Sequence, residues 1–174
     1  GNLYIAATCI VPGSCLNATS SNDISLIKRD IAGITSYTYD QDGFYTGTDI
    51  ANEYAGNGIA MLGSDILISA TGENGSAQLG TGLMRLDTSG GLVGGFGSSG
   101  VATMSILNQE KVNSFAVDLS NSIYVLTSGH TGSGTPPRLV KLNSSGGVDT
   151  SFATSGVYSF LATDRAEDIA IDAS

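Results

Sequence analysis

Several residue types are scarce in this sequence, and their scarcity limits what the chain can be. It has no Trp, one His, two Cys and three Pro, and only 13% of its 174 residues are charged. Hydrophobic residues make up 41%, which argues against intrinsic disorder, because disordered chains combine low hydrophobicity with high charge. Two cysteines are also too few to hold a structural zinc ion.

Long helical or apolar segments are missing as well. No stretch shows the i, i+3, i+4, i+7 spacing of an amphipathic helix, and no apolar run approaches the roughly 20 residues of a membrane-spanning helix. The first residues lack the charged, apolar and small-residue regions of a signal peptide. Because residue 1 is Gly and not Met, we expect the chain to be part of a longer one.

Positive charge is scarce too, since seven Lys and Arg face sixteen Asp and Glu, for a net charge of −9. A chain this acidic lacks the basic surface that neutralises phosphates, so we expect no nucleic-acid partner. An anionic membrane surface is an unsuitable partner for the same reason, and we expect no membrane insertion.

Glycine is abundant, with 24 residues, and much of it belongs to a repeat. The stretches Leu83–Val101 (LMRLDTSGGLVGGFGSSGV) and Leu139–Val157 (LVKLNSSGGVDTSFATSGV) share their order of residue types, and Phe96 and Phe152 are 56 positions apart. A weaker copy places Tyr39 57 positions before Phe96. The chain is therefore predicted to be one repeat domain, 1–174, with repeats at approximately 1–63, 64–120 and 121–174.

Each repeat predicts short strands, because runs of β-branched and aromatic residues follow turn-forming pairs. The sets of equivalent strands are Leu3–Ile5, Ile66–Ile68 and Ile123–Val125; Ser25–Arg29, Leu83–Leu86 and Leu139–Leu142; Val101–Ile106 and Val157–Leu161; and Gly58–Leu62, Ser114–Asp118 and Asp168–Asp172. The fold class is thus all-β, a β-propeller-like array of three four-stranded antiparallel blades. We expect Phe96 and Phe152 to be buried at equivalent places.

The third repeat shows the pattern N/D-x-x-G-G-[apolar]-D-x-x-F-x-x-x-G-V most fully, at Asn143, Gly146, Gly147, Asp149, Phe152, Gly156 and Val157. This pattern, followed by EDIAID at 167–172, resembles the delta-sixty repeat of bacterial secreted and surface β-propellers. The second repeat has Val93 in place of Asp149, and the first keeps little beyond Asp30, Tyr39 and Gly43. The resemblance implies a propeller at an extracellular, cell-surface or periplasmic location, but no particular activity.

Three blades are fewer than the about four to eight of typical propellers. The last predicted strand, Asp168–Asp172, is of the type that would complete the sheet begun by Leu3–Ala6. Unpaired strand edges are adhesive. We therefore expect a partial propeller that is part of a longer chain, or a homo-oligomer in which another copy completes the ring.

Cys9 and Cys15 bracket Pro12 and Gly13 in the longest of three equivalent loops. A pair placed around a turn is well positioned to form a disulfide, and a disulfide would indicate an oxidising compartment. The alternative is two free thiols in a cytosolic protein.

Other polar motifs have structural interpretations. Asp40-Gln41-Asp42-Gly43 begins like a calcium-binding loop but lacks the closing Glu of that loop, so we interpret it as an acidic turn and predict no metal and no cofactor. His130 lies in a Gly-rich loop with no evident catalytic partners, and we interpret it as solvated. The acidic residues around Arg165 are typical of an ion-paired surface loop, namely Asp164, Glu167 and Asp168.

Two functions fit these observations. The first is a non-enzymatic recognition or adhesion module of a bacterial surface or secreted protein, which binds a polar ligand such as a glycan or a cell-surface component through loops on one face. The loops that share a face in propellers here contain Tyr54, Asn108, Lys111, His130, Arg138 and Arg165. The alternative is a propeller-type carbohydrate-active lyase or hydrolase. The lone His and the absence of a repeated acid cluster favour the first, so we predict that the chain is not an enzyme.

Overall fold

The computed structural model describes residues 3–9, 23–30, 33–39, 50–74, 79–104, 110–129 and 135–172. Every regular element in these ranges is a strand, and the strands form three antiparallel sheets. The first sheet contains β1 (Leu3–Cys9), β2 (Asp23–Asp30) and β3 (Gly33–Tyr39). The second contains β4 (Ile50–Leu62), β5 (Asp65–Asn74), β6 (Leu79–Leu86) and β7 (Val101–Thr103). The third contains β8 (Val112–Val117), β9 (Ile123–Thr127), β10 (Arg138–Leu142) and β11 (Val157–Ser159). The predicted all-β class is confirmed.

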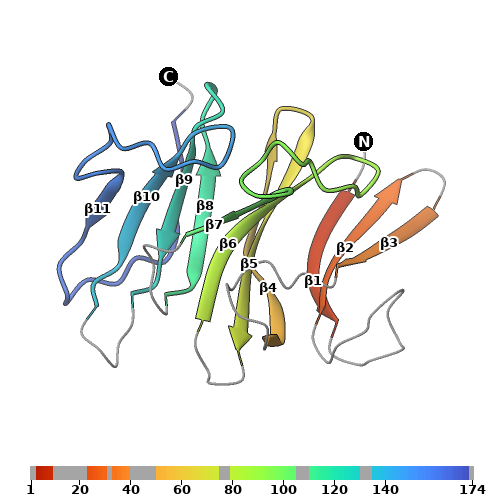
Figure 1. Cartoon of the computed structure of the whole chain (residues 1–174), viewed down its shortest axis with the longest axis horizontal. Coiled ribbons are helices and arrows are strands. Elements are labelled where there is room, and N and C mark those ends of the chain that lie inside the picture. Colours follow the sequence, from red (N-terminus) through yellow and green to blue (C-terminus); the bar gives the residue numbers. More distant parts are fainter. Residues whose placement is uncertain are drawn as a thin grey trace.

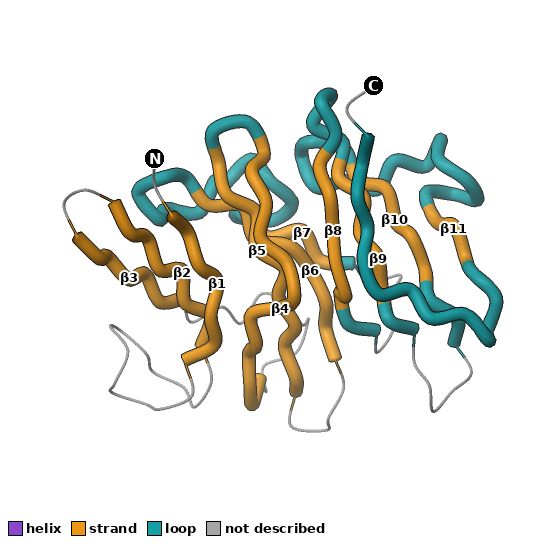
Figure 2. The backbone as a smooth tube through the Cα atoms, turned by 180° about the vertical axis from the view of Figure 1, so that it is seen from behind, coloured by secondary structure: helices purple, strands orange, loops and turns teal. Residues whose placement is uncertain are grey.

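The three sheets stand side by side in a row, with the first sheet at one end and the third at the other (Figure 1). Seen from behind, the segment that follows β11 runs back along β8 and β9 on the outer side of the third sheet (Figure 2). The described strands do not close into a ring. In the second and third sheets the edge strand, β4 or β8, comes from the end of the preceding repeat.

Alternation of side chains along the strands builds one apolar core between each pair of neighbouring sheets. On β5, Ile66 and Ile68 face the first sheet and pack in a core with Leu26, whereas Leu67 faces the third sheet and packs with Ile123. All of these side chains are fully buried. Both faces of the second sheet are therefore covered, which explains why its central strand reads as a nearly continuous apolar run.

The expected equivalence of the two repeat phenylalanines is confirmed for Phe96 and wrong for Phe152. Phe96 is fully buried in the core between the second and third sheets. It lies under the β10–β11 turn of the next repeat, where Gly97 N donates a hydrogen bond of 2.8 Å to Ser145 O. Phe152 is only partly buried, because no following repeat covers it among the described residues.

Two predictions about strands are wrong for the described residues: that Asp168–Asp172 is a strand, and that the first sheet has four strands. Asp168–Asp172 forms no strand, and it lies beside the third sheet and not beside Leu3–Ala6. Within the described ranges the first sheet has three strands and not the four predicted. The Cys9–Cys15 disulfide and the Asp40–Gly43 turn lie outside what the structure describes, since only the backbone of Cys9 is placed.

Candidate functional site at the loop end of the third sheet

The loops that enter β8 and β10 and leave β9 gather at one end of the third sheet. Ser128, just after β9, donates a backbone hydrogen bond of 3.1 Å to the carbonyl of Lys111, just before β8. Arg138, the first residue of β10, donates its backbone N–H to the hydroxyl of Thr127 at 3.0 Å. We call this region the loop end, and it is the part of the sheet where the predicted site residues lie.

A buried acid, Glu110, ties the loop end together. Its side chain is fully buried; Oε2 accepts a 2.6 Å hydrogen bond from Thr127 Oγ1, and Oε1 lies 3.3 Å from Arg138 Nε. Burial raises the pKa of Glu110, while the Thr127 hydroxyl and the Arg138 guanidinium act in the opposite direction. Arg138 compensates the charge of the buried Glu110. The pair therefore has a structural role, because it connects the loop before β8 to the start of β10.

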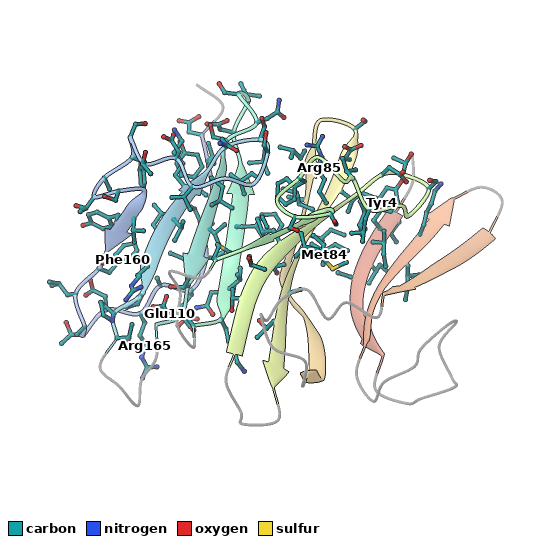
Figure 3. The ribbon with its side chains drawn as sticks, viewed as in Figure 1. Tyr4, Met84, Arg85, Glu110, Phe160 and Arg165 are labelled. Atoms are coloured by element: carbon teal, nitrogen blue, oxygen red, sulfur yellow. The ribbon has the colours of Figure 1, made fainter. Side chains whose placement is uncertain are left out.

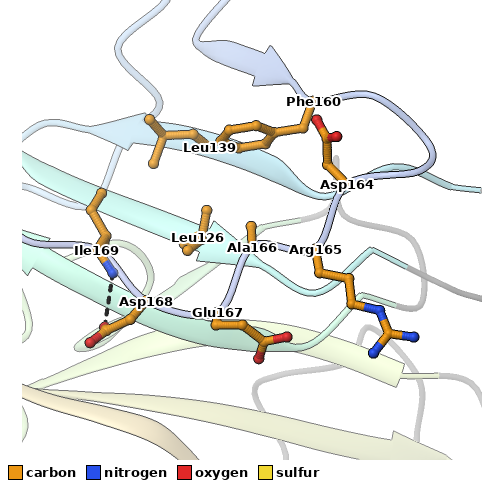
Figure 4. Close-up of a pocket in the computed structure, with 9 residues that line it drawn as sticks. All are labelled: Leu126, Leu139, Phe160, Asp164, Arg165, Ala166, Glu167, Asp168 and Ile169. Atoms are coloured by element: carbon orange, nitrogen blue, oxygen red, sulfur yellow. Dashed lines mark hydrogen bonds between the residues drawn. The ribbon is translucent and has the colours of Figure 1, made fainter.

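A pocket of about 480 Å³ opens between the third sheet and the returning C-terminal segment (Figure 4). Its apolar part is formed by Leu126, Leu139 and Phe160, and the Phe160 ring lies next to Leu139. The remaining lining residues are Asp164, Arg165, Ala166, Glu167, Asp168 and Ile169. The pocket therefore combines an apolar floor with a charged rim.

Hydrogen bonds fix the segment that forms the rim. Asn113 Nδ2 donates to Ala166 O at 2.6 Å, and Ser114 Oγ donates to Asp168 Oδ1 at 2.5 Å. The Ser114 hydroxyl and the backbone N–H of Ile169 lower the pKa of Asp168, so its carboxylate is held ionised. Because Asn113 and Ser114 belong to β8, these bonds bring Arg165 to the same end of the sheet as Lys111.

The structure brings three of the six predicted site residues to the loop end of the third sheet: Lys111, Arg138 and Arg165. Figure 3 labels Arg165 and Glu110 in this region. The backbone of Tyr54 pairs with Thr71 at the corresponding end of the second sheet. Asn108 and His130 lie outside the described residues.

Lys111 and Arg165 differ from the other basic residues of the site. Both side chains are exposed, and within the described ranges neither takes part in an ion pair. Arg138 is paired with Glu110, and at the other end of the sheets Arg85 and Lys141 are paired with Asp65 and Asp149. The expected surface position of the acidic segment is confirmed, but the described part of the chain has no ion pair for Arg165.

The apolar floor of the pocket was not predicted from the sequence. Its only sequence signal is Phe160, which stands where the second repeat has the buried Met104. A bulky apolar residue at this place is thus a core residue in one repeat and a pocket residue in the other. Among the described residues, no group of three or more His, Cys, Asp or Glu is placed to hold a metal ion.

Comparisons with known proteins add no assignment. No model of a known protein family matches the sequence, and no curated protein matches it significantly. The described residues contain no helix that is long and apolar enough to span a membrane.

Proposed function

We propose that this chain is a non-enzymatic recognition or adhesion module that binds an acidic glycan, or a similar polar cell-surface component, at the loop end of the third sheet. The observation that carries the proposal is the pair of exposed cations, Lys111 and Arg165, which have no ion-pair partner in the described chain. Both lie at the loop end of a protein with a net charge of −9, and Arg165 lines the pocket there.

The chemistry of the pocket lining suits a sugar better than a purely ionic ligand. Ligand pockets are mostly apolar with a few polar groups that fix orientation. Leu126, Leu139 and Phe160 offer a surface for the apolar face of a sugar ring. The carboxylates of the rim accept hydrogen bonds from hydroxyl groups, and Arg165 is suited to bind a carboxylate of the ligand.

The same proposal includes the architecture and the location. We propose a β-propeller-like array of the delta-sixty type on a bacterial surface or secreted protein. The support is the repetition itself, since equivalent strands of successive repeats occupy equivalent places in the second and third sheets. Rigid sheets that carry variable loops suit recognition.

An array of bacterial and host glycans, including uronic-acid and sialic-acid oligosaccharides, tests the proposal. We expect binding to acidic members, and a loss of about tenfold in affinity for Arg165→Ala or Lys111→Ala, because each removes a charge-assisted contact. Phe160→Ala should weaken neutral and acidic sugars alike. Lys28→Ala is the matched control, since it removes one positive charge from the first sheet and should leave affinity unchanged.

Two results would overturn the proposal. One is the absence of binding to any member of the array by a folded protein. The other is turnover: if the chain shortens an acidic polysaccharide in a hydrolase and lyase panel, the enzyme alternative is correct.

A further inference from the structure

The described sheets differ in their number of strands. The second and third sheets have four strands each, with orders β4-β5-β6-β7 and β11-β10-β9-β8, while the first has three, β1-β2-β3. Among the described residues, the first sheet has no counterpart of β4 and β8. Such a strand would lie along β1, which is the edge strand there.

The outer face of the first sheet is exposed where its counterparts are buried. Leu3 and Ile5 of β1 are 54% and 45% exposed. The equivalent side chains in the other two sheets are all 0% exposed, because each packs on the sheet of the preceding repeat: Ile66, Ile68, Ile123 and Val125. This face therefore has the apolar residues of an interface between two sheets. In the described chain, no second sheet packs against it.

The opposite end of the row carries the matching surface. Tyr158 in β11 is 51% exposed, whereas its counterpart Ala102 in β7 is 2% exposed. The segment Asp168–Asp172 (DIAID) has the residue order of Gly58–Leu62 and Ser114–Asp118. It is held on β8 through Ser114 and Asn113, so it lies beside the third sheet and ends with Ile171 37% exposed.

We propose that Asp168–Asp172 of one copy of this chain is the fourth strand of the first sheet of a second copy. The register follows from the two complete sheets, where Ile59 pairs with Ile68 and Phe115 pairs with Val125. By equivalence, Ile169 of one copy lies opposite Ile5 of the other, and Ile171 lies opposite Leu3. The added strand is antiparallel to β1 and continues its sheet, as in other cases of strand addition.

A second copy is the occupant because the two surfaces lie at opposite ends of the row in one chain (Figures 1 and 2). The contact continues an interface that the chain already forms twice, between the first and second sheets and between the second and third. It is head-to-tail, and such contacts close into a ring or extend into a filament. Because Phe160 and Ile169 line the proposed glycan pocket, the contact covers that pocket, and only an unassembled chain or the terminal copy of a filament binds the glycan there.

Complementation of two variants tests this arrangement by analytical ultracentrifugation. The wild-type chain should form assemblies, and Ile5→Asp and Ile169→Asp should each sediment as a monomer of 17.7 kDa. An equimolar mixture should form a heterodimer and nothing larger, because Ile5→Asp keeps an intact donor segment and Ile169→Asp keeps an intact acceptor strand. Leu119→Asp is the matched control, since Leu119 is 85% exposed in the β8–β9 turn, and it should assemble like the wild type.

Three outcomes would overturn the proposal: a wild type that stays monomeric up to high micromolar concentration, assembly of Ile5→Asp alone, or a mixture that stays monomeric at that concentration. Circular dichroism shows whether each variant is folded. If a variant does not fold, a labelled peptide of residues 164–174 replaces it, titrated onto the wild-type chain diluted to a concentration at which it is monomeric and its acceptor strand is open. We expect saturable binding, and a loss of at least about tenfold when the peptide carries Asp at position 169. Equal binding of both peptides would also refute strand donation.

Discussion

At the scale of single residues, the first position of the repeat pattern has, in the second and third repeats, a side-chain oxygen that accepts hydrogen bonds from the backbone of the following turn. Asp87 Oδ1 accepts hydrogen bonds from the backbone N–H groups of Ser89 and Gly91, at 2.8 and 2.9 Å. In the next repeat Asn143 Oδ1 does the same for Ser145 and Gly147, both at 3.0 Å. A carboxylate and an amide are interchangeable here because only the acceptor oxygen is used.

Asp149 is the one residue of the pattern that the second repeat replaces, with Val93. Its Oδ1 accepts hydrogen bonds from Ser151 Oγ at 2.6 Å and from Ser151 N at 3.1 Å, and Oδ2 lies 3.0 Å from Lys141 Nζ. The Ser151 hydroxyl is the largest cause, with Lys141 and the Ser151 N–H, of a pKa of Asp149 lowered from 3.8 to about 2.

We predict that Ser151→Ala raises the pKa of Asp149 toward its ordinary value, measured from the carboxyl chemical shift by NMR. Because the folded-state pKa is depressed, the contribution of Asp149 to stability is present above its ordinary pKa of 3.8 and is lost as the pH falls toward about 2. The acid-unfolding curve of Ser151→Ala should show a smaller loss in that window. Ser144→Ala, in an exposed turn position, is the control, and an unchanged Asp149 pKa in Ser151→Ala would contradict the prediction.

At the scale of the elements, the turn between β10 and β11 is where one repeat locks onto another. Gly146 has φ of 81°, and a Cβ built there would lie 2.7 Å from the Ala102 Cβ and 3.0 Å from the Phe96 ring. Two independent features therefore require glycine at this position: the left-handed backbone and the close contact with the second sheet. The Gly-Gly signature of the repeat is a packing requirement between sheets as well as a turn signal.

We predict that Gly146→Ala destabilises the chain by roughly 2–4 kcal/mol, the sum of a left-handed backbone cost and an overpacked contact. Gly63→Ala separates the two terms, because Gly63 has φ of 62° with no atom within 4 Å of an added Cβ. It should cost only about 1 kcal/mol. Urea unfolding measures both. Equal losses for the two variants would mean that the contact on Phe96 is unimportant.

Element boundaries were predictable where apolar residues pack on two sides, and not elsewhere. The central strands β5 and β9 were predicted at Ile66–Ile68 and Ile123–Val125: the apolar run of β5 fills cores on both of its faces, and that of β9 fills one core and lines the pocket with its other face. The structure extends β4 to Ile50, well before the predicted start at Gly58. That part pairs with the end of β5 through backbone hydrogen bonds and a register shift, which the polar sequence ANEYAGN does not signal.

The candidate site shows the same division. Lys111 and Arg165 were predicted as loop-face residues because they stand just before equivalent strands of successive repeats. The floor of the pocket was missed because Leu126 and Leu139 look like core positions. They line a pocket only because the C-terminal segment returns across them, and that path depends on bonds from Asn113 and Ser114 to residues some fifty positions later.

At the scale of the whole molecule, residues at equivalent positions of the repeats differ in burial, because a repeat at the end of the row has a neighbouring sheet on one side only. Phe96 sits in a core closed by the next repeat, whereas Phe152 has Tyr124 as its aromatic neighbour, with ring centroids 5.9 Å apart and nearly perpendicular planes. If a second copy docks as proposed, its first sheet comes to lie against the end of the row that carries Phe152. The energetic value of Phe152 should then depend on assembly, and that of Phe96 should not.

We therefore predict different concentration dependences for two truncations. Phe96→Ala should cost roughly 3–5 kcal/mol, the usual loss for a fully buried ring, at every protein concentration. Phe152→Ala should cost about 1 kcal/mol in dilute, monomeric protein, because a partly buried ring forfeits only part of that burial energy. At concentrations where the wild type assembles, the same variant should cost more, because it also weakens the contact between copies. Urea unfolding across a hundredfold range of concentration distinguishes the cases; a Phe152→Ala loss that matches Phe96→Ala in dilute protein would show that the ring is already covered within one chain.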